Sequence, residues 1–194
     1  MSLSLGTISD FLRISLDRLR YIHYRKKYDI SPSFRFSGVD IQFVGDGEIS
    51  CGEQSYIGSY GEIYSDSNMR VVIGRGSAIS HNVRIFTVTW EADQDFGLSH
   101  KRMKRGNVII GNNCWIGTNV YIDCGITIGE NAVIGANSVV SRDIPPHCIA
   151  VGIPAKVIKI KSYVSDEEKR EIIAKYWSSL NTELQRQHRL PGRN

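Results

Sequence analysis

The sequence predicts an all-β protein built as a left-handed parallel β-helix, and three observations support this fold. Six aliphatic residues, from Ile110 to Val140, stand six positions apart without a break. A second, mostly smaller residue follows each of them after four positions, from Cys114 to Ile144. Glycine and asparagine, which tolerate the backbone angles of tight corners, fill the positions between. Neither a helix nor a strand repeats every six residues, so the chain stacks a strand-and-turn unit, and three units close one triangular coil.

The same repeat extends upstream, although it becomes less regular. Ile73 and Ile79 predict one more coil, for which Thr89 would be the last small inward residue. Ile57 belongs to a coil before that one, and the register is blurred before Cys51. We therefore place the β-helix domain at residues 36–160.

A long interruption separates two parts of the repeat. The spacing between Ile85 and Ile110 is 25 residues, which predicts an excursion loop over residues 91–107. Long loops in a tight repeat usually contact a ligand or a partner. A solvated basic loop is the alternative interpretation, because the segment contains the cluster Lys101, Arg102, Lys104 and Arg105.

An amphipathic helix is predicted before the repeats, within residues 1–35. Ile8, Leu12, Leu16 and Leu19 recur at helical spacing with charged residues between them. We expect this apolar face to cap the open end of the β-helix. Because the helix is also basic, peripheral contact with an anionic membrane is a second interpretation.

A second helical segment is predicted after the repeats, within residues 161–194. Ser165 followed three positions later by Glu168 is the pattern of a capping box, which marks a helix start. Apolar residues continue at helical spacing to about residue 188, and a tail containing Pro191 follows.

Composition narrows the possible functions. The chain of 194 residues carries a net charge of +4, which does not favour nucleic acid as a partner. Its basic residues are clustered, which favours discrete anionic ligands such as polyphosphates. Four cysteines form no close pair and indicate reduced thiols. Neither a signal peptide nor a membrane span is recognisable, so we expect a cytoplasmic protein.

The segment from Asn107 to Lys159 is similar to the C-terminal half of the hexapeptide-repeat acyltransferases. It contains, in order, NNCWIG, GANSVV, DIPP and GIPAKVI, which correspond to motifs of that superfamily. The resemblance is to the branch of galactoside, maltose, xenobiotic and bacterial surface-sugar acetyltransferases. It implies a homotrimer that uses acetyl-CoA, with each active site in a cleft between neighbouring subunits.

The resemblance also implies which residues contact acetyl-CoA. Trp115 and Thr118 correspond to residues that line the pantetheine arm, and Ala136 to one that offers its backbone. Packing against a neighbouring subunit is the alternative interpretation for Trp115, because tryptophan is enriched in interfaces. The side chains expected to meet the CoA phosphates follow the last coil and are Ser141, Arg142, Lys156 and Lys159.

Acetyl transfer requires a general base near neutral pH, and histidine is the side chain that starts there. The galactoside and maltose enzymes keep a histidine where this sequence has Trp90, which is a departure from the family. His81 stands two residues after Ile79, as Thr118 stands two after Ile116, so both fall in one column of successive coils. We therefore expect His81 to be the base. A solvent-facing turn histidine is the alternative.

His100, in the excursion loop, is the second candidate for the base. The catalytic histidine of the xenobiotic branch lies on such a loop, so the resemblance allows His100 to reach a neighbouring subunit. The competing interpretation is a surface residue in a basic run.

The expected activity is acetyl-CoA-dependent O- or N-acetylation of a sugar in a surface polysaccharide or its nucleotide-linked precursor, by direct transfer. Two other classes remain open. One is a non-catalytic β-helix subunit of a glycan-assembly complex, because Trp90 replaces the usual base. The other is a carbonic-anhydrase-like metalloprotein, although the histidine spacing does not match that family and we expect no metal. The acceptor would be bound by residues outside the best-matching segment, namely Ser59, Tyr60, Asp66 and Trp90.

Overall fold

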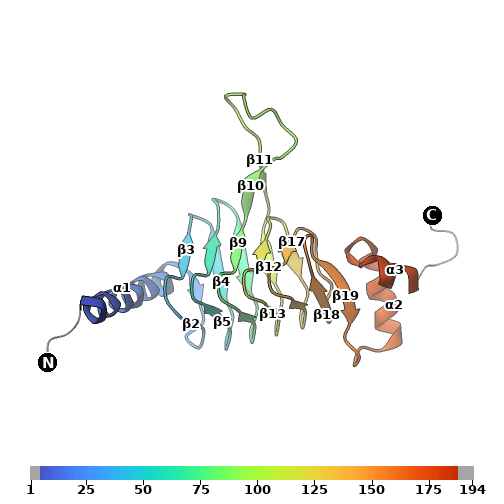
Figure 1. Ribbon diagram of the computed structural model, residues 1–194, viewed down its shortest axis with the longest axis horizontal. Coiled ribbons are helices and arrows are strands. Elements are labelled where there is room, and N and C mark those ends of the chain that lie inside the picture. The colour runs from blue at the N-terminus through green and yellow to red at the C-terminus, as the bar shows by residue number, and fades with distance from the viewer. Residues whose placement is uncertain (1–4, 188–194) are drawn as a thin grey trace.

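The computed structural model describes residues 5–187, and its body is a stack of parallel coils, each made of three short strands (Figure 1). Sheet 1 consists of β1 (Asp29–Ile30), β4 (Glu48–Cys51), β7 (Arg70–Ile73), β12 (Val108–Ile110) and β15 (Thr127–Ile128). Sheet 2 consists of β2 (Arg35–Ser37), β5 (Tyr56–Gly58), β8 (Ala78–Ile79), β13 (Trp115–Ile116), β16 (Val133–Ile134), β18 (Cys148–Val151) and the antiparallel β19 (Lys156–Ile160). Sheet 3 consists of β3 (Gln42–Val44), β6 (Glu62–Tyr64), β9 (Arg84–Phe86), β14 (Tyr121–Ile122) and β17 (Val139–Val140). The predicted parallel β-helix is confirmed.

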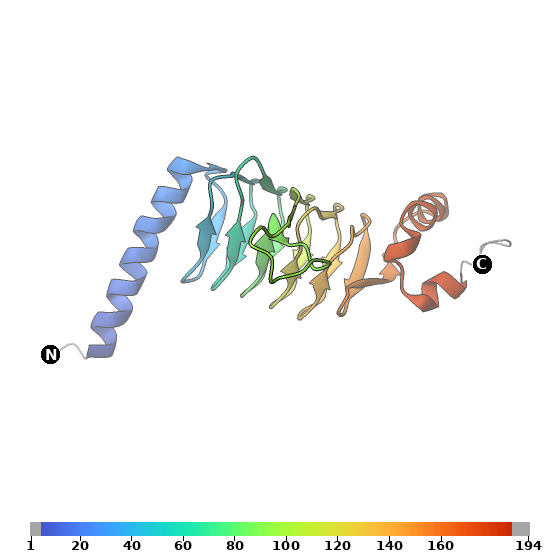
Figure 2. The ribbon, with the colours of Figure 1, turned by 90° about the horizontal axis from the view of Figure 1, so that it is seen from above.

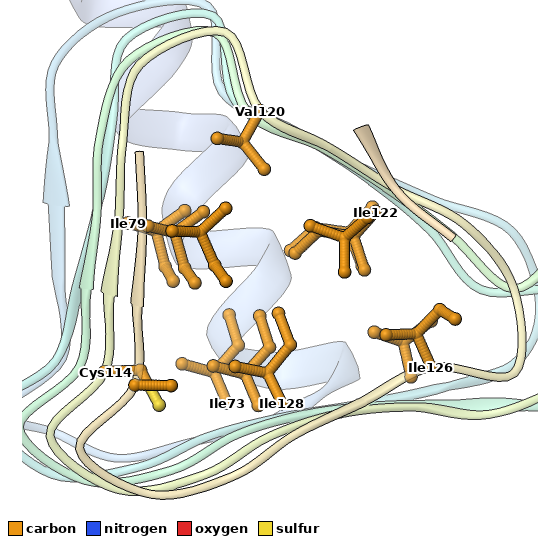
Figure 3. Packing of buried hydrophobic residues seen from close by; sticks show 14 of the residues in the cluster. Ile73, Ile79, Cys114, Val120, Ile122, Ile126 and Ile128 are labelled. Atoms are coloured by element: carbon orange, nitrogen blue, oxygen red, sulfur yellow. The ribbon is translucent and has the colours of Figure 1, made fainter. Parts of the chain in front are cut away.

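The isoleucines of the six-residue repeat form the core. Ile73, Ile110 and Ile128 are register partners on successive coils of sheet 1, and each is at most 1% exposed. Figure 3 shows such columns converging inside the triangular section. Each coil therefore buries its apolar side chains against the coils above and below it, as expected for a solenoid.

The corners use asparagine and glycine for different reasons. Asn113 and Asn119 have φ values of 55° and 60°, in the left-handed region that asparagine tolerates. The glycines directly after the core isoleucines do not. A Cβ added to Gly117 would lie 2.6 Å from the backbone nitrogen of Ala136. Close approach between coils, and not backbone angle, is what requires glycine there.

The first coil begins earlier than the sequence analysis places it. β1 starts at Asp29, and this coil fills its interior with Phe34, Ile41 and Phe43 in place of the repeated isoleucines. The aromatic residues and the irregular spacing obscured the repeat before Cys51.

The excursion from the coils is a β-hairpin. β10 (Val88–Trp90) pairs in antiparallel fashion with β11 (Met103–Arg105), and residues 91–102 join them at the far end, away from the coils (Figure 1). The prediction that Thr89 points into the coil is wrong, because Thr89 belongs to β10 of the hairpin. Thr87 is the threonine that is buried. The backbone N–H of Gly106 donates to the Thr87 carbonyl oxygen at 2.9 Å, so the hairpin leaves and rejoins the coil at one point.

Helix α1 (Leu5–Lys27) caps the first coil with its second half only. The Tyr21 ring stacks on Phe36 at 4.4 Å between centroids, and Tyr24 stacks on Phe43 at 5.1 Å. The predicted packing face is wrong for the residues whose side chains the structure describes. Exposed fractions are 55%, 61% and 65% for Leu12, Leu16 and Leu19. Figure 2 shows the helix projecting obliquely from the end of the stack.

The C-terminal segment folds as two helices joined by a turn. The hydroxyl of Ser165 accepts the Glu168 N–H at 3.3 Å and caps α2 (Asp166–Lys175), as predicted. The helix then stops, and the 3₁₀ turn η1 (Trp177–Ser179) precedes α3 (Thr182–Gln187). The prediction of one continuous helix is therefore wrong, and the predicted tail lies outside the described residues. Within residues 5–187, no helix is long and apolar enough to cross a membrane.

Candidate active site

The candidate base and two of the candidate CoA-binding residues lie at one corner of the β-helix. We call the corner between sheets 2 and 3 the histidine edge, defined by Ser59, His81, Thr118 and Ala136. Ile79, Ile116 and Ile134 are register partners, and each precedes a member of this edge by two residues. Backbone bonds continue the stacking, since Asn119 N–H donates to the His81 carbonyl oxygen at 3.0 Å. The predicted column is thus present.

The imidazole of His81 is exposed but held in place. Its Nδ1 accepts the backbone N–H of Ser59 at 3.0 Å. Because an amide can only donate, the neutral ring carries its hydrogen on Nε2. Gly58 allows this approach, since a Cβ there would stand 2.9 Å from Nδ1. His81 is therefore oriented from the coil below.

An asparagine ladder runs beside the histidine edge. The Asn82 side-chain amide donates to Asn119 Oδ1 at 2.7 Å, and Asn119 donates to Asn137 Oδ1 at 3.0 Å. All three have positive φ. These bonds were not predicted, although the sequence contains the signal for them, because each asparagine stands three residues after a core isoleucine. The ladder ties three coils together next to His81.

Positive charge gathers at the C-terminal end of the histidine edge. Lys156 is the register partner of Val151, beyond the coil of Ala136. Burial lowers the Lys156 pKa, and the nearby charge of Arg142 lowers it further. Two of the four predicted phosphate-binding residues are thus neighbours. Lys159 lies opposite Ile149 on β19.

The outer face of sheet 2 carries Trp115, three residues before Thr118. Its register partners are Ala78 below and Val133 above, and its side chain is 56% exposed. A large aromatic surface is therefore offered to a ligand or a neighbouring subunit next to the histidine edge.

Arg142 also belongs to a second group of cations, which lines a cleft with Ser141. Ser141 and Arg142 border a cleft of about 680 Å³, together with Lys104 of the hairpin and Lys175 of α2. Lys104 was predicted only as part of the basic cluster of the excursion loop, and Lys175 was not predicted here because it comes from a flanking helix. We call the corner between sheets 3 and 1, from which the hairpin leaves, the hairpin edge.

The four residues expected to bind an acceptor divide between the two edges. Ser59 and Tyr60 lie at the histidine edge, where Tyr60 borders a small hollow. Asp66 and Trp90 lie at the hairpin edge. Asp66 accepts a hydrogen bond from Arg105 Nε at 2.7 Å, which holds the pKa of that carboxyl below its usual value. One chain alone does not bring the four together.

His100 lies far along the hairpin, and the described residues contain no cluster of metal ligands. His100 is exposed in the loop joining β10 and β11, which projects from the hairpin edge (Figure 1). Among residues 5–187, no group of three or more histidine, cysteine or acidic side chains could hold a metal ion. The four cysteines are buried free thiols.

Comparisons with known proteins agree with this architecture. The family model described as bacterial transferase hexapeptide (six repeats) matches residues 107–142. A galactoside acetyltransferase in complex with coenzyme A is 27% identical, with a TM-score of 0.65, over 78% of this chain and 76% of that chain. The polySia-specific acetyltransferase NeuO is 27% identical, with a TM-score of 0.57, over 78% and 72%. The hexapeptide-repeat acetyltransferase VCA0836 of Vibrio cholerae O1 biovar eltor, complexed with acetyl-CoA, is 21% identical, with a TM-score of 0.62, over 82% and 91%. No curated protein matches. The resemblance to hexapeptide-repeat acyltransferases is confirmed.

Proposed function

We propose that this hexapeptide-repeat chain, which has the fold of the acetyltransferases, transfers an acetyl group from acetyl-CoA to a hydroxyl or amino group of a sugar. The observation that carries the proposal is the histidine edge, where His81, Thr118 and Ala136 stack beneath a cationic end. The galactoside neighbour described above is a complex with coenzyme A, which supports this donor. No step of the reaction requires a metal.

The donor is proposed to lie along the histidine edge. Successive coils are about 4.8 Å apart, so Thr118 lies about 5 Å and Ala136 about 10 Å above the level of His81. Phosphates would meet Lys156, Arg142 and the other C-terminal contacts, while the pantetheine arm passes Trp115 and descends toward His81. This direction places the anionic end at the cations and the thioester at the imidazole.

The reaction proposed is direct transfer. The acceptor oxygen or nitrogen attacks the thioester carbonyl, the base takes the acceptor proton, and the C–S bond breaks to release the CoA thiolate. His81 is the proposed base. In the resting site the Ser59 N–H orients the ring through Nδ1. Nε2 takes the acceptor proton once the ring hydrogen has moved to Nδ1, which releases the bond from Ser59.

Replacing His81 with alanine tests the base. We expect the turnover number to fall by roughly 10²- to 10⁴-fold, the usual contribution of a general base, with little change in CoA affinity. His100→Ala is the matched control and should have a much smaller effect. If His100→Ala abolishes turnover and His81→Ala does not, the loop histidine is the base. If neither variant loses activity, the proposed chemistry is wrong.

Changing the cations tests the donor site independently. Arg142→Glu and Lys156→Glu should each weaken CoA binding measured by calorimetry, because a phosphate contact becomes a repulsion. Binding by the unaltered protein should also weaken as salt is raised. Unchanged affinity in both variants would place the CoA phosphates elsewhere.

A homotrimer is part of the proposal. The predicted acceptor-binding residues Asp66 and Trp90 stand at a different corner from His81, as does His100, the second candidate for the base. A neighbouring subunit could present all three to His81. Closed symmetric assembly also suits a short solenoid with exposed flat faces. Light scattering should give about three times the chain mass of 21.8 kDa, and a stable active monomer would contradict it.

The acceptor is proposed to be a sugar of a surface polysaccharide or its nucleotide-linked precursor. The names of the two 27% identical neighbours, which specify galactoside and polySia, support a sugar. A cytoplasmic location is also proposed, because reduced thiols persist there. A screen of sugars and nucleotide sugars with acetyl-CoA would identify the acceptor, and no turnover with any would favour a non-catalytic subunit.

A further inference from the structure

Helix α1 presents an apolar face that the β-helix does not cover. Because a helix turns about 100° per residue, Leu12, Leu16, Leu19 and Ile22 fall within an arc of roughly 120°. Their exposed fractions are 55%, 61%, 65% and 53%. We call these four residues the leucine stripe. Large side chains gathered on one exposed face usually mark a contact surface.

The leucine stripe lies on the side of α1 that does not dock on the first coil, and only its margin, at Leu12 and Leu16, borders a hollow shared with Asp40. The residues that dock α1 are Asp17, Tyr21 and Tyr24, on the opposite side of the helix. Asp17 accepts the backbone N–H of Asp40 at 3.0 Å and pairs with Arg20 at 2.9 Å. These contacts fix the rotation of the helix about its axis. Since α1 projects from the end of the stack (Figures 1 and 2), the stripe is accessible to a large flat surface.

The charges of α1 indicate what covers the stripe. Its sequence contains six lysine and arginine residues and two aspartates, a net charge of +4. Arg18 flanks the stripe on one side, and Arg13 and Arg20 flank it on the other. Leucines between rows of arginine are the pattern of a helix that lies in the headgroup region of an anionic bilayer.

A second copy of α1 fits the stripe less well. Two or three helices of charge +4 would place like charges side by side along the seam, which opposes pairing. A bilayer-spanning role is also unsuitable, because charged residues occur throughout the helix and it is not apolar enough to cross a membrane. A membrane surface that contains acidic lipids can bury the apolar face of α1 and attract its positive charge at the same time.

We propose that α1 docks the protein on anionic lipid surfaces through the leucine stripe, with Arg18 beside the stripe contacting lipid phosphates. The inference concerns α1 and stands independently of the proposed transferase activity.

Vesicle flotation with the full chain tests the proposal. Binding should occur to phosphatidylcholine vesicles containing about 30% phosphatidylglycerol, not to pure phosphatidylcholine, and should weaken in high salt. The double variant Leu16→Ser/Leu19→Ser should lower the partition coefficient at least about tenfold, because two exposed leucines no longer enter the bilayer. Arg18→Gln should lower it about threefold to fivefold.

Ile14→Ser is the matched control. Ile14 is 43% exposed on the same helix but lies outside the stripe, so its loss should leave vesicle binding and mass unchanged. Equal binding to both vesicle types, or equal loss in the control, would overturn the proposal. So would a fall in the mass of the double variant by light scattering, because a second copy would then cover the stripe. CoA affinity should not change in any of these variants, which separates failure here from failure of the proposed function.

Discussion

Gly58→Ala displaces His81 without altering its chemistry. An added Cβ would stand 2.9 Å from both the backbone nitrogen and Nδ1 of His81, against 3.4 Å for ordinary contact. The histidine must therefore move by about 0.5 Å, and the bond from Ser59 to Nδ1 must lengthen or break. Misplacement by 1 Å can cost on the order of 10²-fold in rate, so we expect a loss of roughly tenfold in the turnover number.

Gly52→Ala is the matched control for this experiment. Its added Cβ would stand 2.5 Å from the backbone nitrogen of Arg75, so it strains the same coil at a corner remote from His81. Both variants should lose about 1–3 kcal/mol of unfolding free energy. Steady-state kinetics of the two, with CoA affinity from calorimetry, separate strain from misplacement. Equal turnover numbers in the two variants would refute the reasoning that Gly58 positions His81.

Three further predictions concern stability. Ile116→Ala should lower the unfolding free energy by about 2–5 kcal/mol in urea titrations, because Ile116 is fully buried. Burial raises the pKa of the Cys148 thiol to about 12. In the unfolded chain this thiol ionises at about pH 8.5. The unfolding free energy should therefore fall as the pH rises from about 8.5 to about 12, and this fall should be absent from Cys148→Ala. The bond from Arg105 lowers the pKa of Asp66, so the ionised Asp66 should anchor the hairpin above about pH 4 and release it as the pH falls below that value. Limited proteolysis of residues 91–102 would detect the release. Asp66→Asn should release the hairpin at neutral pH.

The regular coils were predictable because isoleucine recurs at a fixed spacing in them. Isoleucine at every sixth position fixes both the inward direction and the register, so the stacking of His81, Thr118 and Ala136 follows by counting. The first coil was missed because phenylalanines fill it under the cap of α1, where packing against the helix replaces the isoleucine repeat. Periodicity also identified a helix at residues 5–27 but not its docked face, since tyrosines and a buried aspartate pack there in place of leucines.

Site details that depend on backbone polar groups were beyond the sequence analysis. The bond from Ser59 to His81 Nδ1 joins residues 22 positions apart, and its donor is a main-chain amide that every residue type shares. Lys104 and Lys175 line one cleft because β11 rejoins the coils at the corner beside which α2 packs. The sequence shows that charges cluster, whereas their grouping around a ligand depends on the path of the chain.

The bond from Gly106 to Thr87 has a consequence for how this scaffold can change. Because the excursion starts and ends at one point of the coil, its length can vary without shifting the register of any strand above it. Residues 88–105 therefore form an interchangeable cassette. Exchange of this segment between proteins of the same architecture would show whether it sets the acceptor preference, because His81, Thr118 and Ala136 at the histidine edge keep their register.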